Sequence, residues 1–418
     1  MRSRARLALS SLSVRNYRLY FAGQAVSFSG NWMQQVAIAW LVLRLTNSPF
    51  LLGATMALQT LPYLLLGVWG GLVADRMSKR RLLICTQSAQ VVPAIALWTL
   101  SYAGWARLWM VFAIVLLRGL INVFDNPARQ SFVTEMVGPE RVVNAVSLNA
   151  SIVQAGRLLG PAAAAILIAT VGLPACFLVN GLTYAFMVAM LLLMRPRELV
   201  PAPVAPRGPG QLRETMSTVA RTPQLRLPIC LMAVVGLLAF NFTVVLPAVA
   251  RFTFGGDATT YALMVNFLAL GSLGGALASG TRSHVSSRAV AWAALGFGAA
   301  LAAASVVDDF AVMLVALAAV GAASVMFSAS TQSALQLTSA PEMRGRVLSL
   351  YQVVYAGTTP LGALIVGALA SSVGARSGLV LGAVAALLAG AVGVWATRTE
   401  ATLPTQLGSD LTSTVEGA

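Results

Sequence analysis

Apolar residues along this chain gather into long runs, which are separated by short stretches rich in charge, proline and glycine. Each run is close to the roughly 20 residues that an α-helix needs to cross a bilayer. The pattern predicts membrane-spanning helices at residues 19–43, 50–74, 82–103, 108–124, 145–171, 174–194, 228–250, 260–280, 288–306, 310–332, 347–371 and 375–397. We therefore expect an all-α membrane protein with twelve transmembrane helices.

An internal repeat divides these helices into two sets. The segment 139–172 recurs as 341–374 at a constant offset of 202. The matched pairs are Pro139/Pro341, Glu140/Glu342, Ser147/Ser349, Leu148/Leu350, Leu159/Leu361, Gly160/Gly362, Leu167/Leu369, Val171/Val373 and Gly172/Gly374. Repeats of this size in an apolar chain are typical of secondary transporters.

The repeat predicts two pseudo-symmetric six-helix bundles, with proline and arginine concentrated between them. The predicted boundaries are a basic cytoplasmic N-terminus at 1–18, a first bundle at 19–194, a cytoplasmic linker at 195–227, a second bundle at 228–397 and a cytoplasmic tail at 398–418.

Composition and charge place the chain in a membrane. It is 58% hydrophobic and 10% charged, with a mean hydropathy of +0.79, which excludes an ordinary soluble domain. Most of the 28 Lys and Arg residues fall in the loops that share a side with both termini, so both termini are predicted to be cytoplasmic. The net charge of +15 then indicates anionic lipid at the cytoplasmic face as a partner, and not nucleic acid.

Metal, nucleotide and enzyme chemistry find no support in the sequence. Cys85, Cys176 and Cys230 lie in predicted spans without ligand spacing, and the single histidine, His284, lies in a loop. No GxxxxGK[ST] motif and no nucleophile with a base at usable spacing occurs. We expect no metal, no cofactor and no enzymatic activity.

The most specific local motif is the loop Gly71-Leu72-Val73-Ala74-Asp75-Arg76-Met77-Ser78-Lys79-Arg80-Arg81, which resembles the loop signature of the major facilitator superfamily. The residues that match this signature are Gly71, Asp75, Arg76, Lys79 and Arg80. Ser78 departs from it, because a turn glycine is usual there. The resemblance implies the major facilitator fold and transport by alternating access.

Asp75 has a physical reason to dock on another helix. A carboxylate at the C-terminal end of a helix opposes that helix's own dipole, whereas the helix predicted to begin near Val347 offers exposed amides on the same side. The resemblance implies the same contact, which latches the inner face shut in an outward-open state, with Lys79 bridging to Asp125. The alternative is a basic loop that only sets topology.

Further segments resemble one bacterial branch of the superfamily, which includes enterobactin-exporter-like and related drug-efflux proteins. They are Trp32-Met33-Gln34-Gln35, Arg118-Gly119, Phe124-Asp125-Asn126-Pro127-Ala128-Arg129-Gln130, Asn144 to Asn149, Pro341-Glu342-Met343-Arg344-Gly345-Arg346-Val347 and Pro360-Leu361-Gly362. The resemblance implies a monomeric exporter of a siderophore, acidic metabolite or drug in the bacterial cytoplasmic (inner) membrane. It adds Asp125 and Arg129 to the gating and coupling residues.

The segment Gly156-Arg157-Leu158-Leu159-Gly160-Pro161 resembles the superfamily's antiporter motif, although alanines replace its last two glycines. Gly156 and Gly160 let helices approach closely, and Pro161 bends its helix. Ordinary helix packing explains the motif as well as antiport does.

Arg118 and Arg157 are predicted to lie at membrane depth, where a charged group costs about 2.5–3.5 kcal/mol even on the lenient insertion scale. Such a cost favours a cavity over lipid, and two unpaired arginines would make that cavity electropositive and suited to anionic substrates. The alternative is that they snorkel or bond to carbonyls between helices.

The family's architecture implies that the first, fourth, seventh and tenth helices line the cavity. The polar candidates on these helices and on the eleventh are Gln24, Asn31, Gln35, Asn122, Asn241, Ser324, Ser328, Tyr351, Gln352 and Tyr355. Interhelical hydrogen bonds are an equal alternative for each of them.

The energy source follows from the acidic residues. The predicted membrane interior holds no carboxylate or histidine, which leaves Asp125 as the best proton carrier. Proton-coupled export, driven by the proton gradient, is the leading hypothesis. An uncoupled facilitator and a lipid flippase are the alternatives, and a non-transporting receptor is disfavoured by the short tail.

Overall fold

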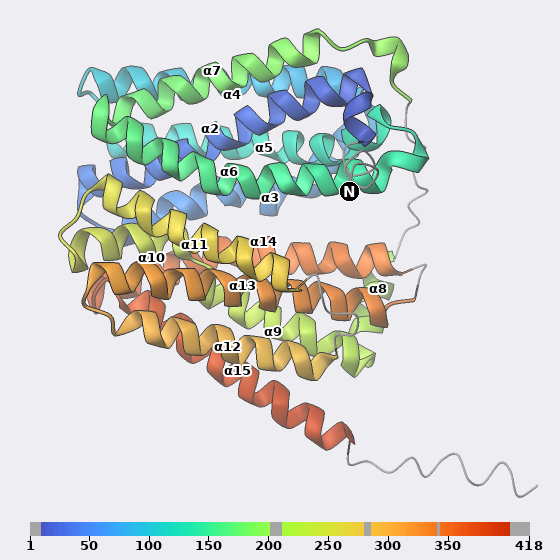
Figure 1. The fold of residues 1–418 in the computed structure, drawn as a ribbon, viewed down its shortest axis with the longest axis vertical. Helices are drawn as coiled ribbons and strands as arrows, with labels where there is room; N and C mark the ends of the chain where they lie inside the picture. Colours follow the sequence, from blue (N-terminus) through green and yellow to red (C-terminus); the bar gives the residue numbers. More distant parts are fainter. Residues whose placement is uncertain (1–9, 201–210, 280–285, 341–342, 402–418) are drawn as a thin grey trace, which may run out of the picture.

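The computed structural model describes residues 10–200, 211–279, 286–340 and 343–401, and these are almost entirely helical (Figure 1). The first helices are α2 (Arg15–Thr46), α3 (Pro49–Arg76), α4 (Lys79–Tyr102), α5 (Leu108–Met136), α6 (Val142–Thr170) and α7 (Leu173–Leu192). They are followed by α8 (Gln211–Arg221), α9 (Pro223–Ala239), α10 (Phe242–Ala248), the π-helix η4 (Val249–Thr253), α11 (Ala258–Ser279), α12 (Ser287–Ser305), α13 (Phe310–Thr338), α14 (Arg344–Ser372) and α15 (Ser377–Ala401). Short 3₁₀ helices occupy Ser10–Ser13, Pro139–Arg141 and Pro196–Glu198.

Eleven helical segments in this part of the chain are long and apolar enough to cross a membrane, so the protein is a multi-pass membrane protein. Helix α2 is not among the eleven. Its sequence includes Arg15, Arg18 and Arg44 and a series of buried amides, which lower its hydropathy. The twelfth predicted span therefore stays a prediction.

Several helix ends differ from the predicted ones. Helix α5 runs to Met136, whereas hydropathy predicted an end at residue 124, because its last turns are polar. The seventh predicted span is broken between α9 and α10. The predicted linker at 195–227 contains the helix α8. The predictions for residues 1–9, 201–210, 280–285, 341–342 and 402–418 lie outside the described residues.

The internal repeat appears directly in the helix bounds. Helices α6 and α14 differ by the same offset of 202 at both ends, and so do α5 and α13. Gly172 and Gly374 follow α6 and α14 with φ values of 105° and 133°, which only glycine adopts without strain. The repeated sequence thus specifies equivalent helices with equivalent ends.

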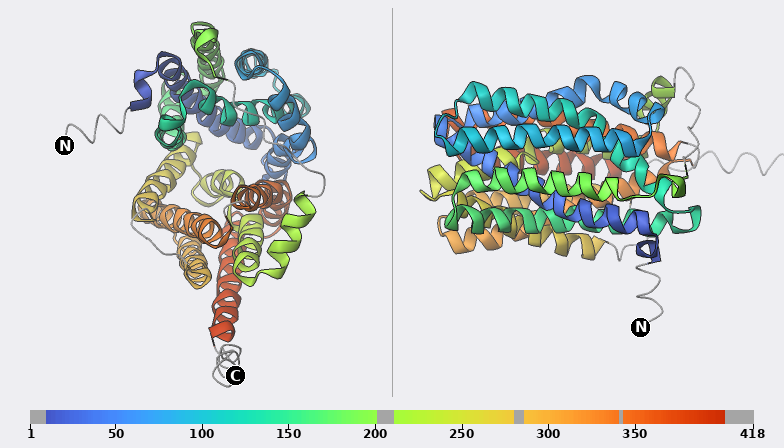
Figure 2. Two further views of the ribbon diagram at one scale, coloured as in Figure 1. Left: turned by 90° about the vertical axis from the view of Figure 1, so that its right-hand side faces the viewer. Right: turned by 90° about the horizontal axis from the view of Figure 1, so that it is seen from above.

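The helices α2 to α7, here called the first group, pack mainly on one another, and so do α9 to α15, the second group. The two groups meet where α3 packs on α14 and α6 packs on α11 (Figures 1 and 2). One end of the molecule carries the turn between α2 and α3 and is called the Asn47 end. The opposite end, with the turn between α3 and α4 and helix α8, is called the Asp75 end (Figure 1).

The seam between the groups is tightly packed near the Asn47 end. A Cβ atom on Gly53 of α3 would lie 2.2 Å from the carbonyl oxygen of Ala363 in α14. The amide of Phe50 donates to Ser371 Oγ at 2.9 Å, and Arg251 Nη2 donates to Asn47 Oδ1 at 2.5 Å. Backbones this close require glycine, since any side chain at Gly53 would force the helices apart.

The same two helices carry exposed apolar side chains toward the Asp75 end. Leu65 and Trp69 of α3 are 66% and 67% exposed, and Val353 of α14 is 61% exposed. The opposite helix group therefore does not cover these three side chains, whereas the seam is tightly packed near the Asn47 end.

Candidate functional site: a cavity between the two helix groups

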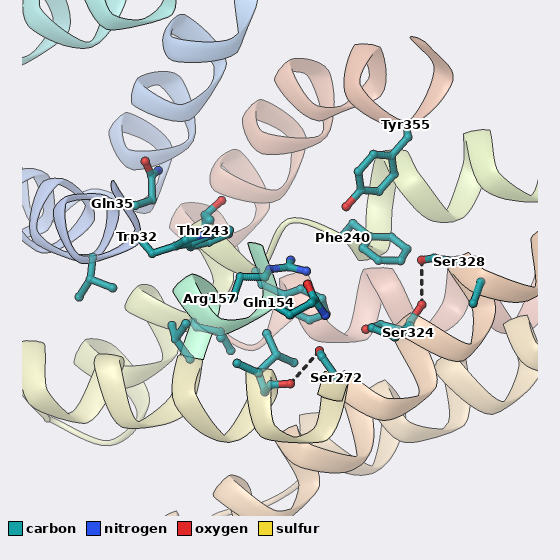
Figure 3. A pocket seen from close by; sticks show the side chains of 18 of the residues that line it. Trp32, Gln35, Gln154, Arg157, Phe240, Thr243, Ser272, Ser324, Ser328 and Tyr355 are labelled. Carbon is teal, nitrogen blue, oxygen red and sulfur yellow. Dashed lines mark hydrogen bonds between the residues drawn. The ribbon is translucent and has the colours of Figure 1, made fainter. Parts of the chain in front are cut away.

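The central cavity is a space of about 350 Å³ between the two groups. The first group contributes Trp32 and Gln35 from α2 and Arg157 from α6. The second group contributes residues of α10, α11, α13 and α14, together with Phe240 from the break between α9 and α10 (Figure 3). The cavity therefore lies where any relative movement of the groups would reshape it.

Arg157 is the single charged side chain among the described residues that line this cavity. Its guanidinium lies over the ring of Trp32, 5.1 Å from the centroid, so a cation–π contact orients it (Figure 3). One turn further along α6, Pro161 has no N–H. The backbone carbonyl of Arg157 therefore lacks the hydrogen bond that it would accept in a regular helix. The cavity thus presents one positive charge on an aromatic support.

An aromatic cluster forms the wall on the second group. Phe240 contacts Phe242, Phe297, Phe327 and Tyr355, with the ring of Tyr355 perpendicular to it at 5.6 Å. The chain leaves helical geometry at Phe240 and Asn241. The side-chain Nδ2 of Asn241 donates to the Leu237 carbonyl, which a backbone N–H would bond in a continuous helix. The helix break therefore places Phe240 at the cavity surface, facing Ser324 and Ser328 (Figure 3).

A second compartment of about 290 Å³ adjoins the central cavity. Trp32, Gln35 and Thr243 line both spaces, so the two spaces are direct neighbours. Its polar lining consists mainly of amides, and Gln59 Nε2 donates to Gln35 Oε1 at 3.3 Å.

Most of the predicted cavity residues line one of these spaces. The central cavity takes Gln35, Arg157, Ser324, Ser328, Tyr351, Gln352 and Tyr355, and the second compartment takes Asn31 and Asn122. Three predicted residues do not line either space, since Gln24, Arg118 and Asn241 are 0%, 1% and 3% exposed and point into helix interfaces. Arg118 therefore lies between helices in this conformation, and its role as a cavity residue stays a prediction.

Sequence reasoning missed six polar or aromatic residues that line the central cavity, namely Trp32, Gln154, Thr243, Tyr261, Ser272 and Gln332. Gln154 lies one turn before Arg157 on the same face of α6, so helical periodicity was a usable signal for it. Tyr261 and Ser272 lie on α11, which the family's architecture does not place at the cavity.

Asp125 lies in a buried polar cluster inside the first group. Thr86 Oγ1 and Gln87 Nε2 of α4 each donate to its Oδ1 at 2.7 Å, and Arg129 Nε donates to Oδ2 at 3.0 Å. Arg129 is one turn along α5 and also lies over the ring of Phe28, at 5.2 Å. Four donors, counting Arg129 Nη2, therefore bond to the two oxygens of this carboxylate.

The ion pair of Lys79 differs from the expected one. Lys79 Nζ lies 3.0 Å from Glu135 Oε1, and both side chains are about nine-tenths buried. Asp125 is instead paired with Arg129. The reason is the length of α5, because its true end places Glu135, rather than Asp125, beside the start of α4.

The rest of the loop motif caps helices at the Asp75 end. Ser78 has φ −59°, a value open to any residue, so this turn does not need the usual glycine. Arg80 donates to the carbonyls of Leu191 and Leu192 at the C-terminus of α7, where a cation is favourable. Gly71 and Arg76 lie in the last turns of α3. The docking of Asp75 on α14 stays a prediction.

Gly156 and Gly160 lie at the contact between α6 and α2. A Cβ atom at Gly160 would lie 2.5 Å from Trp32 Cβ, and one at Gly156 would lie 3.0 Å from Phe28 Cβ. The two glycines let α6 approach α2 closely enough to bring Arg157 over Trp32.

This fold is shared with membrane transporters of known structure. The crystal structure of a bacterial homologue of the human lysosomal transporter Spinster, in an inward-facing conformation, matches with a TM-score of 0.72 and 15% identity, covering 92% of this chain and 97% of that chain. The class that the fold defines is therefore that of multi-pass membrane proteins built like these transporters.

The family is shown by sequence. The family model described as transmembrane secretion effector matches residues 7–411, and the chain belongs to this family of the major facilitator superfamily. The staphyloferrin A transporter of Staphylococcus aureus is 25% identical over 257 residues, which cover 61% of this chain but only 64% of that transporter. Macrolide efflux protein A of Streptococcus pyogenes is 24% identical over 371 residues, which cover 86% of this chain and 91% of that protein.

Proposed function

We propose that this protein is a proton-coupled secondary transporter that exports small organic anions with an aromatic or apolar part. The observation that carries the proposal is Arg157, a lone positive charge in an otherwise neutral, aromatic-lined cavity. Such a site favours an anionic group at Arg157 and a flat apolar portion against Phe240 and Tyr355. The names of the relatives, a siderophore transporter and an efflux protein, are compatible with export of such molecules.

Alternating access is proposed from the unequal ends of the seam. The Asn47 end is closed by the contact of Gly53 with Ala363, whereas α3 and α14 leave Leu65, Trp69 and Val353 exposed toward the Asp75 end. If basic loops remain cytoplasmic, the Asp75 end faces the cytoplasm of a bacterial cell, and both termini lie on that side of the inner membrane. The conformation is then inward-facing, and the latch at Asp75 belongs to the opposite state.

Helix α2 is proposed as the twelfth span, which completes two six-helix bundles. Its 32 residues reach about 48 Å, enough to cross a bilayer. It packs on α6 and α7, and its amides Gln24, Gln34 and Asn31 face protein interior. Polar residues that are buried in protein do not prevent a helix from spanning. The protein is proposed to act as a monomer, with anionic lipid at its basic cytoplasmic face.

Proton coupling is proposed to act through Asp125. A proton on this carboxylate would release Arg129 and weaken the bonds from Thr86 and Gln87, so protonation and helix packing in the first group are linked. The proton gradient would then be the energy source. An uncoupled facilitator is the alternative, because Asp125 is also well satisfied in its charged state.

The proposal is tested with inside-out membrane vesicles and two dyes of similar size, carboxyfluorescein as an aromatic anion and rhodamine 6G as an aromatic cation. We expect an acid-interior pH gradient to drive uptake of the anion, and Arg157→Gln to abolish it. Transport of the cation alone, or full anion transport by Arg157→Gln, would contradict the anion site. Nigericin, with the voltage held by valinomycin and potassium, separates the mechanisms, since uncoupled flux does not respond to loss of the pH gradient.

A further inference from the structure

The buried charges inside the first helix group cancel in pairs, with one exception. Lys79 is paired with Glu135, and Arg129 is paired with Asp125. Arg118 is 1% exposed, and no ion pair in the described part of the chain includes it. The interior of this group therefore carries one uncompensated positive charge.

The hydrogen bonds of Arg118 are also incomplete. Its Nη2 donates to Asn31 Oδ1 at 2.8 Å, whereas Nε and Nη1 have no hydrogen-bond partner. A guanidinium that is removed from water normally fills its donors, because an unpaired buried charge is strongly unfavourable. Two charged donors are thus aimed into the protein without an acceptor.

The layer around Arg118 supplies further donors and no negative charge. Tyr184 of α7 donates to the same Asn31 oxygen at 3.1 Å, so this acceptor is already shared. Gln34, one turn along α2 from Asn31, leaves its Nε2 without a partner. Gln90 of α4 leaves its Oε1 acceptor without a partner. Water that bridges these unpartnered donors and this acceptor is therefore the alternative to a bound anion.

A route from the transport cavity to Arg118 is short. Asn31, which bonds to Arg118, lines the second compartment, and so does Asn122, which lies one turn from Arg118 on α5. A single layer of amide side chains thus separates the compartment from the guanidinium. An ion that enters from the second compartment would have to pass only this layer.

We propose that Arg118 is the centre of a binding site for a small monovalent inorganic anion, chloride, inside the first helix group. The anion accepts from Nε and Nη1 of Arg118 and neutralises the charge that no carboxylate balances. The site is separate from the anion position proposed at Arg157, so its failure would leave the transport proposal unchanged.

Chloride that binds only the folded protein stabilises it in proportion to the logarithm of its concentration above Kd. The thermal midpoint of the purified, substrate-free protein is measured while chloride replaces gluconate at constant ionic strength. We expect the midpoint to rise by a few degrees per tenfold increase in chloride, and bromide to give an anomalous diffraction peak beside Arg118. A midpoint that is equal in chloride and gluconate overturns the proposal and leaves bridging water as the alternative.

Two variants locate the site, and a third is the matched control. Asn31→Asp places a carboxylate where Nη2 already bonds, so we expect it to be stable without chloride and insensitive to it. Arg118→Gln should also lose the chloride response, and Arg157→Gln should keep it. If Arg118→Gln does not fold, the chloride response of Asn31→Asp still tests the site. An unchanged chloride response in Asn31→Asp, or loss of the response in Arg157→Gln, overturns the assignment.

Discussion

The substitution Gly53→Ala should wedge open the seam between α3 and α14. The new Cβ atom would lie 2.2 Å from the Ala363 carbonyl oxygen, and ordinary contact begins near 3.4 Å, so the helices must separate by about 1.2 Å at this point. Overpacking of this kind costs about 1–3 kcal/mol. In a conformation in which α3 and α14 are apart at this point, the close contact is absent. The ratio of the two conformations then changes by about 5- to 150-fold.

The assay is a distance measurement between spin labels at the Asn47 end. Trp105, between α4 and α5, and Val306, between α12 and α13, are 69% and 73% exposed and belong to different groups. Both are replaced by cysteine after the native Cys85, Cys176 and Cys230 are changed to serine. We expect longer distances in Gly53→Ala, together with slower maleimide labelling of Val353→Cys at the Asp75 end.

Gly296→Ala is the matched control for this experiment. It makes the same exchange inside α12, where an added Cβ meets nothing within 4 Å. Both variants gain the same helix propensity, so only the contact with Ala363 differs between them. Equal distance distributions in Gly53→Ala and Gly296→Ala would refute the expected separation of α3 and α14. They would also contradict the proposal that this seam opens during transport.

Four other variants test the Asp75 end and the Asp125 cluster. Glu135→Gln should lower the free energy of unfolding by about 3–5 kcal/mol because it strands the buried ammonium of Lys79. Lys79→Met combined with Glu135→Leu should recover most of that loss in the same thermal assay, and a single variant as stable as wild type would exclude the ion pair. Asp125→Asn should preserve expression but remove the response of vesicle flux to the pH gradient, and a retained response would move the proton elsewhere. Asp75→Asn should insert normally but cripple transport, and normal vesicle flux would remove the latch role.

The repeat was the strongest sequence signal, because it reports packing that both halves must satisfy. The offset of 202 predicted equivalent helices, and α6 and α14 begin and end at equivalent residues. The resemblance to the superfamily also predicted Gln35, Ser324 and Tyr355 as cavity residues, and all three line the central cavity. Hydropathy alone did not locate the end of α5, since a helix that leaves the membrane continues in polar residues.

The direction of Arg118 was beyond the reach of the sequence. Its depth followed from the apolar residues on both sides, but depth does not tell which neighbouring helix a side chain faces. The structure turns Arg118 toward Asn31 and Tyr184, inside the first group. The break at Phe240 was likewise hidden, because an apolar run looks the same whether its helix is continuous or interrupted.

Equivalent positions of the two repeats carry residues of different chemistry. Asp125 of α5 corresponds to Phe327 of α13 at the same offset of 202, and Phe327 is fully buried against Phe240 and Phe297. An aromatic cluster has no second set of partners to exchange, so it favours a single packing. A buried ion pair can be broken by a proton or exchanged for another charge, so it has two states of different cost. We therefore expect energy coupling to act in the first group, against the aromatic cluster of the second group.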